Sequence, residues 1–195
     1  KDFLKEVAWG ELDLLLFDTP PGTSDEHLST VTLLQQSGGL TGAIIVTTPQ
    51  EVAMADVRRE ANFCRKMNVP ILGFVENMSG FVCPKCTKES QIFPSPYKQG
   101  SEERLSEEFG APVLGKIPLD PRLMQACEQG KSLRRYLEEE AANAATTTAS
   151  SSSSSAPSAN ATSSGAAAAV PVTSPAVTAI DGVAQKLMNI LAAQE

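Results

Sequence analysis

The sequence has only one histidine, His27, and no apolar run long enough to cross a bilayer. A metal centre built on several histidines is therefore excluded, as is a Ser/His/Asp triad without His27. Membrane helices need about 18 or more consecutive apolar residues, so we expect no membrane span and no membrane partner. His27 follows two acidic residues in the first turn of an expected helix, and we expect it to be solvated rather than catalytic.

Basic residues are also scarce, because 23 Asp and Glu outnumber 16 Lys and Arg and give a formal charge of −7. Without a Lys/Arg cluster, the chain is a poor candidate for nucleic-acid binding. Four cysteines, at positions 64, 83, 86 and 127, are too few for a secreted disulfide scaffold of this length. We therefore expect a cytoplasmic, reducing compartment and one thiol-based site.

Charge is absent from Ala141 to Ile180, a stretch of mostly Ala, Ser and Thr with six consecutive serines at 150–155. Such a segment has too few large apolar groups to offset the entropy lost on ordering. We expect a folded body over 1–140, a disordered linker over 141–179 and a C-terminal helix over 180–195. Because the chain opens on Lys1 inside a helical pattern, we expect it to be part of a longer protein.

Short apolar runs alternate with helical patterns through the folded body. Strands are expected at 12–17, 42–47, 71–75 and 113–117, and helices at 25–37, 51–67 and 99–109. This alternation predicts an α/β fold in which helices wrap a parallel sheet. Ligands bind such sheets at the carboxyl ends of the strands. Four loops should therefore meet at one site, beginning at Asp18, Pro49, Asn77 and Pro118.

Asp18 ends the first apolar run and is followed by a Pro-Pro-Gly turn that contains Gly22. In phosphate-binding ATPases a carboxylate in this place supports Mg²⁺, while the glycine backbone approaches the terminal phosphate. Asp, Pro and Gly are also the ordinary residues of a turn. Spacing alone leaves both readings open.

Cys83 and Cys86 form a C-x₂-C pair in an expected irregular loop. The pair is typical of a metal or cluster site, although a redox dithiol or two unremarkable thiols remain open. Two thiolates cannot complete a zinc site or an iron–sulfur cubane, because both take four ligands. The other ligands would come from elsewhere, most simply from the same pair on a second subunit.

The other candidate residues allow plainer readings. Cys64 lies on the apolar face of the expected helix 51–67, which predicts a core residue. Cys127 lies in a short helical stretch beside Leu123 and Met124, which indicates packing or partial exposure. Asn77 is either a turn residue at a strand end or an amide that reads a purine edge, and spacing does not choose between these.

Four segments, in this order and spacing, resemble the Mrp/NBP family. They are DTPPGTSDEH (18–27), TTPQE (47–51), ENMSGFVCPKC (76–86) and GKIPLDPRL (115–123). Members of this family are deviant P-loop ATPases that act as scaffolds or carriers for iron–sulfur clusters, similar in fold to MinD and the nitrogenase iron protein. The resemblance covers 1–140. Segment 83–93 looks most like the larger scaffold subunit of the eukaryotic cytosolic iron–sulfur assembly system, with the smaller subunit second.

The resemblance implies a role for each matching residue. Asp18 would support Mg²⁺ bound with ATP, Gly22 would lie near the γ-phosphate, and Asn77 and Pro118 would flank the adenine. Cys83 and Cys86 would supply two of four ligands of a [4Fe–4S] cluster that bridges two subunits. The implied partners are a second copy or the smaller scaffold subunit, in a homodimer or heterotetramer, and apo iron–sulfur client proteins.

Two departures from the family pattern stand out. No G-x-x-x-x-G-K-[ST] motif occurs in the 195 residues, so the N-terminal P-loop unit is expected to be missing from this chain. The Ala/Ser/Thr-rich linker is not part of the family pattern either.

Two other function classes remain open. A MinD-like positioning ATPase without a cluster would not need Cys83 and Cys86, and the anaerobic protein would be colourless. A non-enzymatic zinc-bridged dimer would contain zinc without iron or sulfide.

Overall fold

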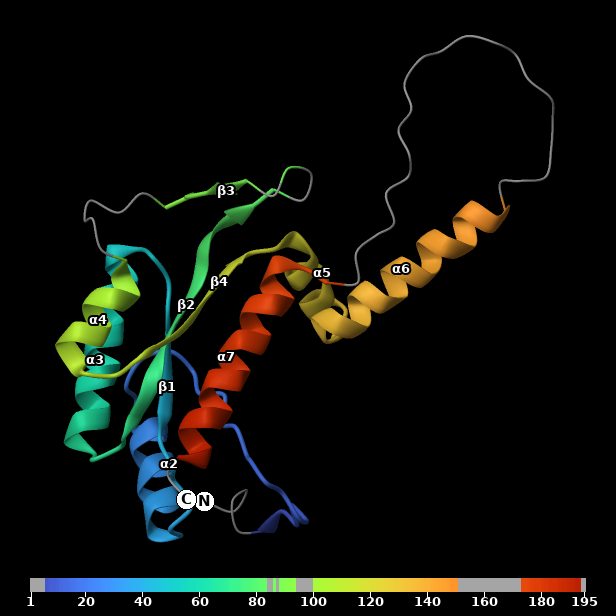
Figure 1. The fold of residues 1–195 in the computed structure, drawn as a ribbon. Coiled ribbons are helices and arrows are strands. Elements are labelled where there is room, and N and C mark those ends of the chain that lie inside the picture. Colours follow the sequence, from blue (N-terminus) through green and yellow to red (C-terminus); the bar gives the residue numbers. More distant parts are fainter. Residues whose placement is uncertain (1–5, 84–85, 87, 94–99, 151–172, 194–195) are drawn as a thin grey trace, which may run out of the picture.

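The computed structural model describes residues 6–83, 86, 88–93, 100–150 and 173–193, and it centres on one sheet. The strands are β1 (Ala43–Thr47), β2 (Ile71–Val82), β3 (Glu89–Ser90) and β4 (Val113–Leu119). β2 pairs in parallel with β1 on one side and with β4 on the other, and antiparallel with the short β3 (Figure 1). The expected α/β fold is confirmed, and β3 makes the sheet mixed rather than purely parallel.

Helices cover both faces of the sheet. They are α2 (Asp25–Gln36), α3 (Glu51–Lys66), α4 (Ser101–Phe109), α5 (Pro121–Glu128), α6 (Leu133–Ser150) and α7 (Pro175–Ala192). α3 and α4 lie on one face and α7 on the other, while α6 projects from the body (Figure 1). The helices expected at 25–37, 51–67 and 99–109 are each found within two residues of these bounds. α4 ends at Gly110, whose φ of 70° is the left-handed conformation expected of a C-terminal cap.

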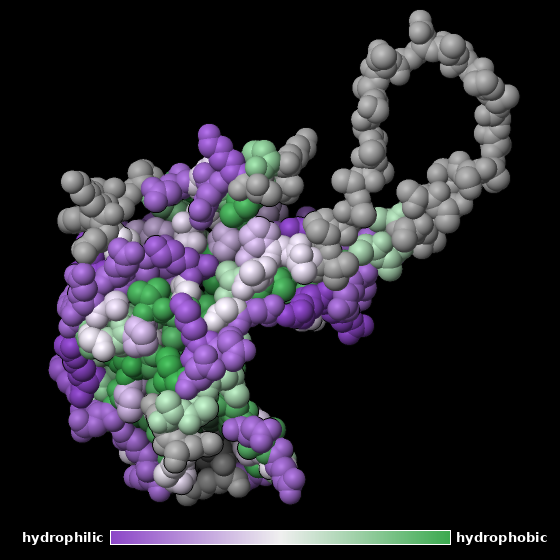
Figure 2. Space-filling view, in the orientation of Figure 1, coloured by the Kyte–Doolittle hydropathy of each residue, from purple (hydrophilic) through white to green (hydrophobic). Residues whose placement is uncertain are grey.

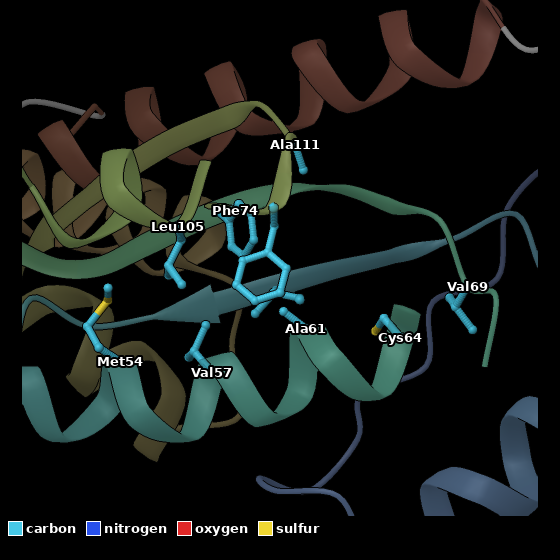
Figure 3. Packing of buried hydrophobic residues seen from close by; sticks show 10 residues of the cluster. Met54, Val57, Ala61, Cys64, Val69, Phe74, Leu105 and Ala111 are labelled. Carbon is cyan, nitrogen blue, oxygen red and sulfur yellow. The ribbon is translucent and has the colours of Figure 1, made fainter. Parts of the chain in front are cut away.

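The main core lies between the sheet and the helices α3 and α4, as Figure 3 shows. Phe74 of β2 is fully buried between strands and helices and packs against Phe109 of α4, with ring centroids 6.2 Å apart. Cys64 belongs to this cluster, which confirms it as a core residue. Burial, with a smaller effect of Glu60, raises the pKa of the Cys64 thiol. A buried thiol that resists ionisation is a packing group rather than a metal ligand.

α7 packs closely on β4 because Gly115 has no side chain. A Cβ at this position would lie 2.6 Å from Cγ2 of Val183 in α7, which is too near for two carbon atoms. The start of α7 also joins a second, smaller core with α5 and α6, where Ala126, Leu137 and Ala176 are fully buried. The C-terminal helix is thus a third layer on the sheet.

The strand expected at 12–17 is wrong, because this run forms no strand and is exposed along its whole length. Its large apolar side chains are open to solvent, up to 70 % at Leu16. Apolar surface is also in the open elsewhere, as the green area between α4 and α7 in Figure 2 shows. A strand needs a neighbour for its backbone groups, and no described strand pairs with this run. Apolar composition alone therefore did not make a strand here.

The strand expected at 71–75 is longer than predicted. β2 continues through Glu76 and Asn77 to Val82, so these two residues lie inside the strand and not in a loop after it. Pro118 likewise lies inside β4, which was expected to end at residue 117. The prediction placed the strand ends where polar residues begin, but both ladders continue beyond that point.

The expected C-terminal boundaries also differ from the structure. Residues 141–150 continue α6, and the C-terminal helix begins at Pro175 rather than at residue 180. Ser174 caps it by accepting a hydrogen bond from the backbone N–H of Val177. Most of the linker expected at 141–179 lies outside the described residues and stays a prediction. None of the described helices is long and apolar enough to cross a bilayer.

Candidate functional site

Asn77 and Pro118 lie next to each other on adjacent strands. Asn77 of β2 is in register with Ile117 of β4, directly before Pro118. The Asn77 side chain accepts a hydrogen bond from the backbone N–H of Met78 at 2.9 Å, and Met78 has a positive φ of 56°. The fold therefore brings the two residues expected at the adenine to one place on the sheet.

A polar cluster, buried except for Lys116, lies directly beside this pair. Thr47, Glu76 and Lys116 form one row across β1, β2 and β4. From the first turn of α4, the Ser101 hydroxyl donates a hydrogen bond to Glu76, and the Lys116 ammonium contacts the carboxylate of Glu102. Glu76 is 4 % exposed and Glu102 is fully buried. These contacts attach the start of α4 to the middle of the sheet.

The two carboxyl groups of this cluster have opposite pKa shifts. Burial, reinforced by a hydrogen bond with Glu102, raises the pKa of Glu76 to about 7. Burial opposes ionisation of Glu102 as well, but hydrogen bonds from Glu76 and Lys116 hold the pKa of Glu102 below its usual value. One carboxyl group is therefore neutralised by a proton and the other is paired with Lys116, because two unpaired charges would be costly in this place.

The cysteine pair lies at the turn between β2 and β3. The turn is closed by the Cys83 backbone N–H, which donates to the Lys88 carbonyl at 3.1 Å. The expected irregular loop is therefore the tip of a β-hairpin. Cys83 is half-buried and Cys86 is exposed, whereas Pro84, Lys85 and Thr87 lie outside the described residues.

Cys83 and Cys86 are two of the four ligands that a metal centre of this kind needs. Two cysteines separated by two residues fit a soft metal or an iron–sulfur cluster as cargo. Within the part of the chain that the structure describes, no group of three or more His, Cys, Asp or Glu side chains could hold a metal ion. The further ligands would have to come from outside that part.

Asp18 and Gly22 lie in the coil before α2, where Asp18 is exposed and Gly22 half-buried, and the loop 18–24 that contains them contacts α3. The Gly22 backbone N–H donates to Oε1 of Glu60 at 3.0 Å, and Gly22 has a φ of 95°. Among the described residues, no hydrogen bond or ion pair joins Asp18 or Gly22 to Asn77 or Pro118. Four loops at one edge of the sheet were expected, but Asn77 and Pro118 lie within the neighbouring strands β2 and β4, and no described strand precedes Asp18.

We expected His27 to be solvated, but its ring also forms hydrogen bonds that close the loop 18–24. Nδ1 accepts from the Ser24 backbone N–H at 3.2 Å, and Nε2 lies 2.9 Å from the Pro20 carbonyl. Sequence reasoning missed this role and that of Glu60. The spacing Ser-x-x-His at the start of a helix is a signal for the first, since a residue three after the N-cap can reach back to the cap. No local signal marks Glu60, which meets the loop only through the fold.

Asn77 and Cys83 are connected by one continuous strand. Six residues of extended chain span at most about 20 Å, and β2 is irregular over this stretch, with a positive φ at Met78 and a register shift against β4 between Asn77 and Phe81.

Comparison with known proteins gives a family and a fold neighbour. A family model described as "ParA: NUBPL iron-transfer P-loop NTPase" matches residues 1–152. A nucleotide-binding protein from Archaeoglobus fulgidus, solved with ADP and with cobalt found by PIXE, is 36 % identical with a TM-score of 0.55. The match covers 68 % of this chain and 51 % of that protein, so the chain spans about half of its length.

Two MinD structures are more distant. The septum site-determining protein MinD from Pyrococcus horikoshii, with Mg-ADP, is 18 % identical, has a TM-score of 0.44, and the match covers 82 % of this chain and 47 % of that one. MinD from Aquifex aeolicus is 16 % identical, has a TM-score of 0.42, and the match covers 85 % and 60 %. The family match confirms the resemblance found in the motifs.

Proposed function

Because the chain belongs to the NUBPL iron-transfer P-loop NTPase family, we propose that it carries [4Fe–4S] clusters between paired subunits and passes them to apo-proteins under ATP control. The observation that supports this most is the cysteine pair at the tip of the β2–β3 hairpin, on the strand that also carries Asn77. Cys86 is exposed and Cys83 partly so, which leaves the thiols accessible to a second subunit.

The cluster is cargo in this proposal, and the two thiolates are half of its ligands. A [4Fe–4S] cluster takes four cysteine ligands, so two chains would hold it between them. The same hairpin of a second copy, or the hairpin of a related smaller scaffold subunit, supplies the other pair. Apo iron–sulfur proteins then receive the cluster, and a cytosolic location suits these exposed thiols.

The nucleotide side of the proposal rests on Asn77, Pro118, Asp18 and Gly22. Asn77 and Pro118 would flank the adenine from neighbouring strands, Asp18 would support Mg²⁺, and the Gly22 amide would contact the γ-phosphate. The 195 residues contain no G-x-x-x-x-G-K-[ST] motif, so the phosphate cradle would come from a longer protein of the family. We therefore expect the 195-residue chain alone to bind ATP poorly, as calorimetry would measure.

Anaerobic reconstitution with iron and sulfide tests the cluster. The wild-type chain should contain about four iron atoms and four sulfides per two chains, and its mass in solution should be that of a dimer. Cys83→Ala and Cys86→Ala should each lose the cluster and the dimer together, because the cluster itself cross-links the subunits.

Cys127→Ala is the matched control, since it removes an exposed thiol outside the hairpin and should leave iron content unchanged. A full cluster on a monomer, or undiminished iron in Cys83→Ala, would refute the bridging arrangement. Zinc without iron or sulfide would favour a zinc-bridged dimer, and a colourless protein without metal would favour a MinD-like ATPase.

A further inference from the structure

The cysteine pair lies in a segment whose two ends meet inside the fold. Glu76 stands in β2 directly before this segment, and Ser101 is the first residue of α4 directly after it. The Ser101 hydroxyl donates a hydrogen bond to the Glu76 carboxyl group, although the two residues are 25 positions apart. We call residues 77–100 the thiol segment, because Cys83 and Cys86 lie within it. The bond between Glu76 and Ser101 closes the base of this segment.

The two arms of the thiol segment are held to different degrees. The outgoing arm is the second half of β2, which still has Phe81 in register with Leu119 of β4. The return arm begins with the short β3, which pairs with β2 at Phe81–Ser90 and Val82–Glu89. A two-stranded hairpin with so few pairs is marginally stable by itself. The return arm, and with it the turn that carries the thiols, is therefore the part that a closed base stabilises.

Glu76 bonds to both of the first two residues of α4 when it carries a proton. One oxygen of the neutral carboxyl group accepts from the Ser101 hydroxyl, and its O–H donates to the Glu102 carboxylate. An ionised carboxylate only accepts hydrogen bonds, so ionised Glu76 would lose the bond to Glu102 and face a second negative charge. Both carboxyl groups are buried, so water does little to screen that repulsion.

In the described part of the chain, the charges around Glu76 are already paired with other groups. Lys116 of β4 stands in the same row of the sheet, but its ammonium contacts Glu102. Thr47, which β1 places in this row, carries no charge. Further charged groups of α3, α4 and α7 bond elsewhere: Glu103 to the Gly100 amide, Arg104 to Glu51, Asp181 to Arg134 and Lys186 to the Val113 carbonyl. Loss of the proton from Glu76 would therefore leave a negative charge unpaired in the closed base.

We propose that Glu76 is a positioning residue for the thiol pair, because its neutral carboxyl group fastens the first turn of α4 to β2 and so closes the base of the thiol segment. The inference deepens the proposed cluster-carrying function and rests on it for any effect on a cluster. Water would reach Glu76 in an open base and return its pKa from about 7 toward the ordinary 4.5, so opening releases a proton. The base is therefore most firmly closed below pH 4.5 and opens more readily as the pH rises to 7. A cluster on Cys83 and Cys86 would be held less firmly at the higher pH.

Amide hydrogen exchange of the 195-residue chain, followed by NMR, tests the closed base without any metal. The Cys83 N–H, which donates to the Lys88 carbonyl, reports on the turn. Glu76→Gln is the comparison, since its amide can accept from Ser101 and donate to Glu102 at every pH. The ratio of Cys83 exchange in wild type to that in Glu76→Gln should rise up to about tenfold per pH unit from about pH 5 to pH 7. A ratio that does not change with pH would overturn the proposal.

Two further variants test which groups close the base. Ser101→Ala removes the hydroxyl and should speed Cys83 exchange roughly tenfold at about pH 5, where Glu76 is neutral. Exchange equal to that of wild type would show that Ser101 does not close the base. Glu103→Gln is the matched control, because it changes a carboxylate in the same turn of α4 and should keep the wild-type pH profile.

Low concentrations of urea separate the opening of the base from a general effect of Glu76 on stability. Urea favours global unfolding, which exposes far more surface than the opening of one segment. Cys83 exchange should therefore depend on urea less steeply than exchange of the Phe74 amide, which is bonded to the Pro112 carbonyl in the sheet. An equal dependence would mean that Glu76 acts only through global stability, and the positioning role would be refuted.

Iron retention after anaerobic reconstitution with iron and sulfide tests the effect on the cluster. At about pH 8, Glu76→Gln should lose iron to a chelator roughly tenfold more slowly than wild type, and Ser101→Ala should lose it more quickly. Glu103→Gln should match wild type. Equal rates for wild type and Glu76→Gln would overturn the effect of Glu76 on the thiol pair. If wild type assembled no cluster at all, the proposed function would fail, whereas Cys83 exchange would still decide whether Glu76 closes the base.

Discussion

Two regions of this molecule have similar apolar composition and opposite fates. The run 12–17 and the first half of β2 are both short stretches dominated by large apolar residues. β2 has a paired strand on each side and helices over both faces, and its Phe74 is fully buried. Leu16 is 70 % exposed in a coil. Hydrophobicity makes a segment suitable for burial, but the strand forms only where neighbours supply hydrogen bonds and cover.

The largest expected change in the free energy of unfolding comes from truncating a buried apolar side chain in the first half of β2. Phe74→Ala should lower the free energy of unfolding by about 3–5 kcal/mol, because it removes a buried ring and leaves a cavity. Urea unfolding followed by circular dichroism measures this. A loss below about 1 kcal/mol would show that the sheet core is no better packed than the exposed run.

The next largest effect on stability is expected from the carboxyl group of Glu76 inside the sheet, and this effect depends on pH. Burial, with the hydrogen bond that protonated Glu76 donates to Glu102, raises the pKa of Glu76 from 4.5 to about 7. The folded state therefore holds this proton more tightly than the unfolded chain does. Its contribution to stability is complete below pH 4.5 and is lost as the pH rises through 7. The loss should reach about 2–3 kcal/mol on the alkaline side.

Glu76→Gln keeps the side chain neutral and should remove this decline between about pH 5 and pH 8. Urea unfolding at several pH values, with wild type and variant side by side, checks it. Parallel pH profiles would mean that Glu76 does not carry the effect. Glu102 has a lowered pKa and acts with the opposite sign, in the range below pH 4.5.

A smaller change in stability is expected where α7, the third layer, contacts β4. Gly115→Ala should cost about 1–2 kcal/mol, since the new Cβ would lie 2.6 Å from Val183 Cγ2 and α7 must shift. Gly182→Ala is its control within α7, because nothing lies within 4 Å of that position and alanine favours helix. Gly182→Ala should be neutral or stabilising by up to about 1 kcal/mol. Equal effects of the two in thermal unfolding would contradict close packing at Gly115.

The smallest effect belongs to the exposed run. Leu16→Ala should change the free energy of unfolding by less than about 0.5 kcal/mol, because the side chain is largely in solvent in the folded chain. The same urea experiment used for Phe74→Ala measures it. A cost near that of Phe74→Ala would mean that the run 12–17 is covered in solution by another segment or another copy.

Much of the fold could be predicted from the sequence, and specific residues show why the rest could not. The helices α2, α3 and α4 follow local rules of periodicity and capping, and Gly110 ends α4 as its position predicts. The lengths of β2 and β4 could not be read locally, because Asn77 and Pro118 stay in strands only through pairing with each other's neighbours. The strand predicted at 12–17 does not form for the same reason, because no described strand pairs with this run.

The candidate site divides in the same way. Cys83 and Cys86 are near in space because they are near in sequence, so the motif itself predicted a shared ligand site. Sequence order did not tell where β2 and β4 end, because Asn77 and Pro118 lie inside these strands. The contact between Gly22 and Glu60, 38 positions apart, had no signal in either segment. Neither had the contact of Glu76 with Ser101, 25 positions apart.

The sequence by itself determined the alternation of helices and strands, the family motifs and the cysteine pair, because these depend on residues within a few positions of one another. Only the tertiary structure decided which apolar run became a strand, which carboxylate was buried next to another, and which helix side chain holds the loop before α2. Those outcomes depend on pairing, burial and charge between segments distant in sequence, and a local pattern contains no information on which segments meet.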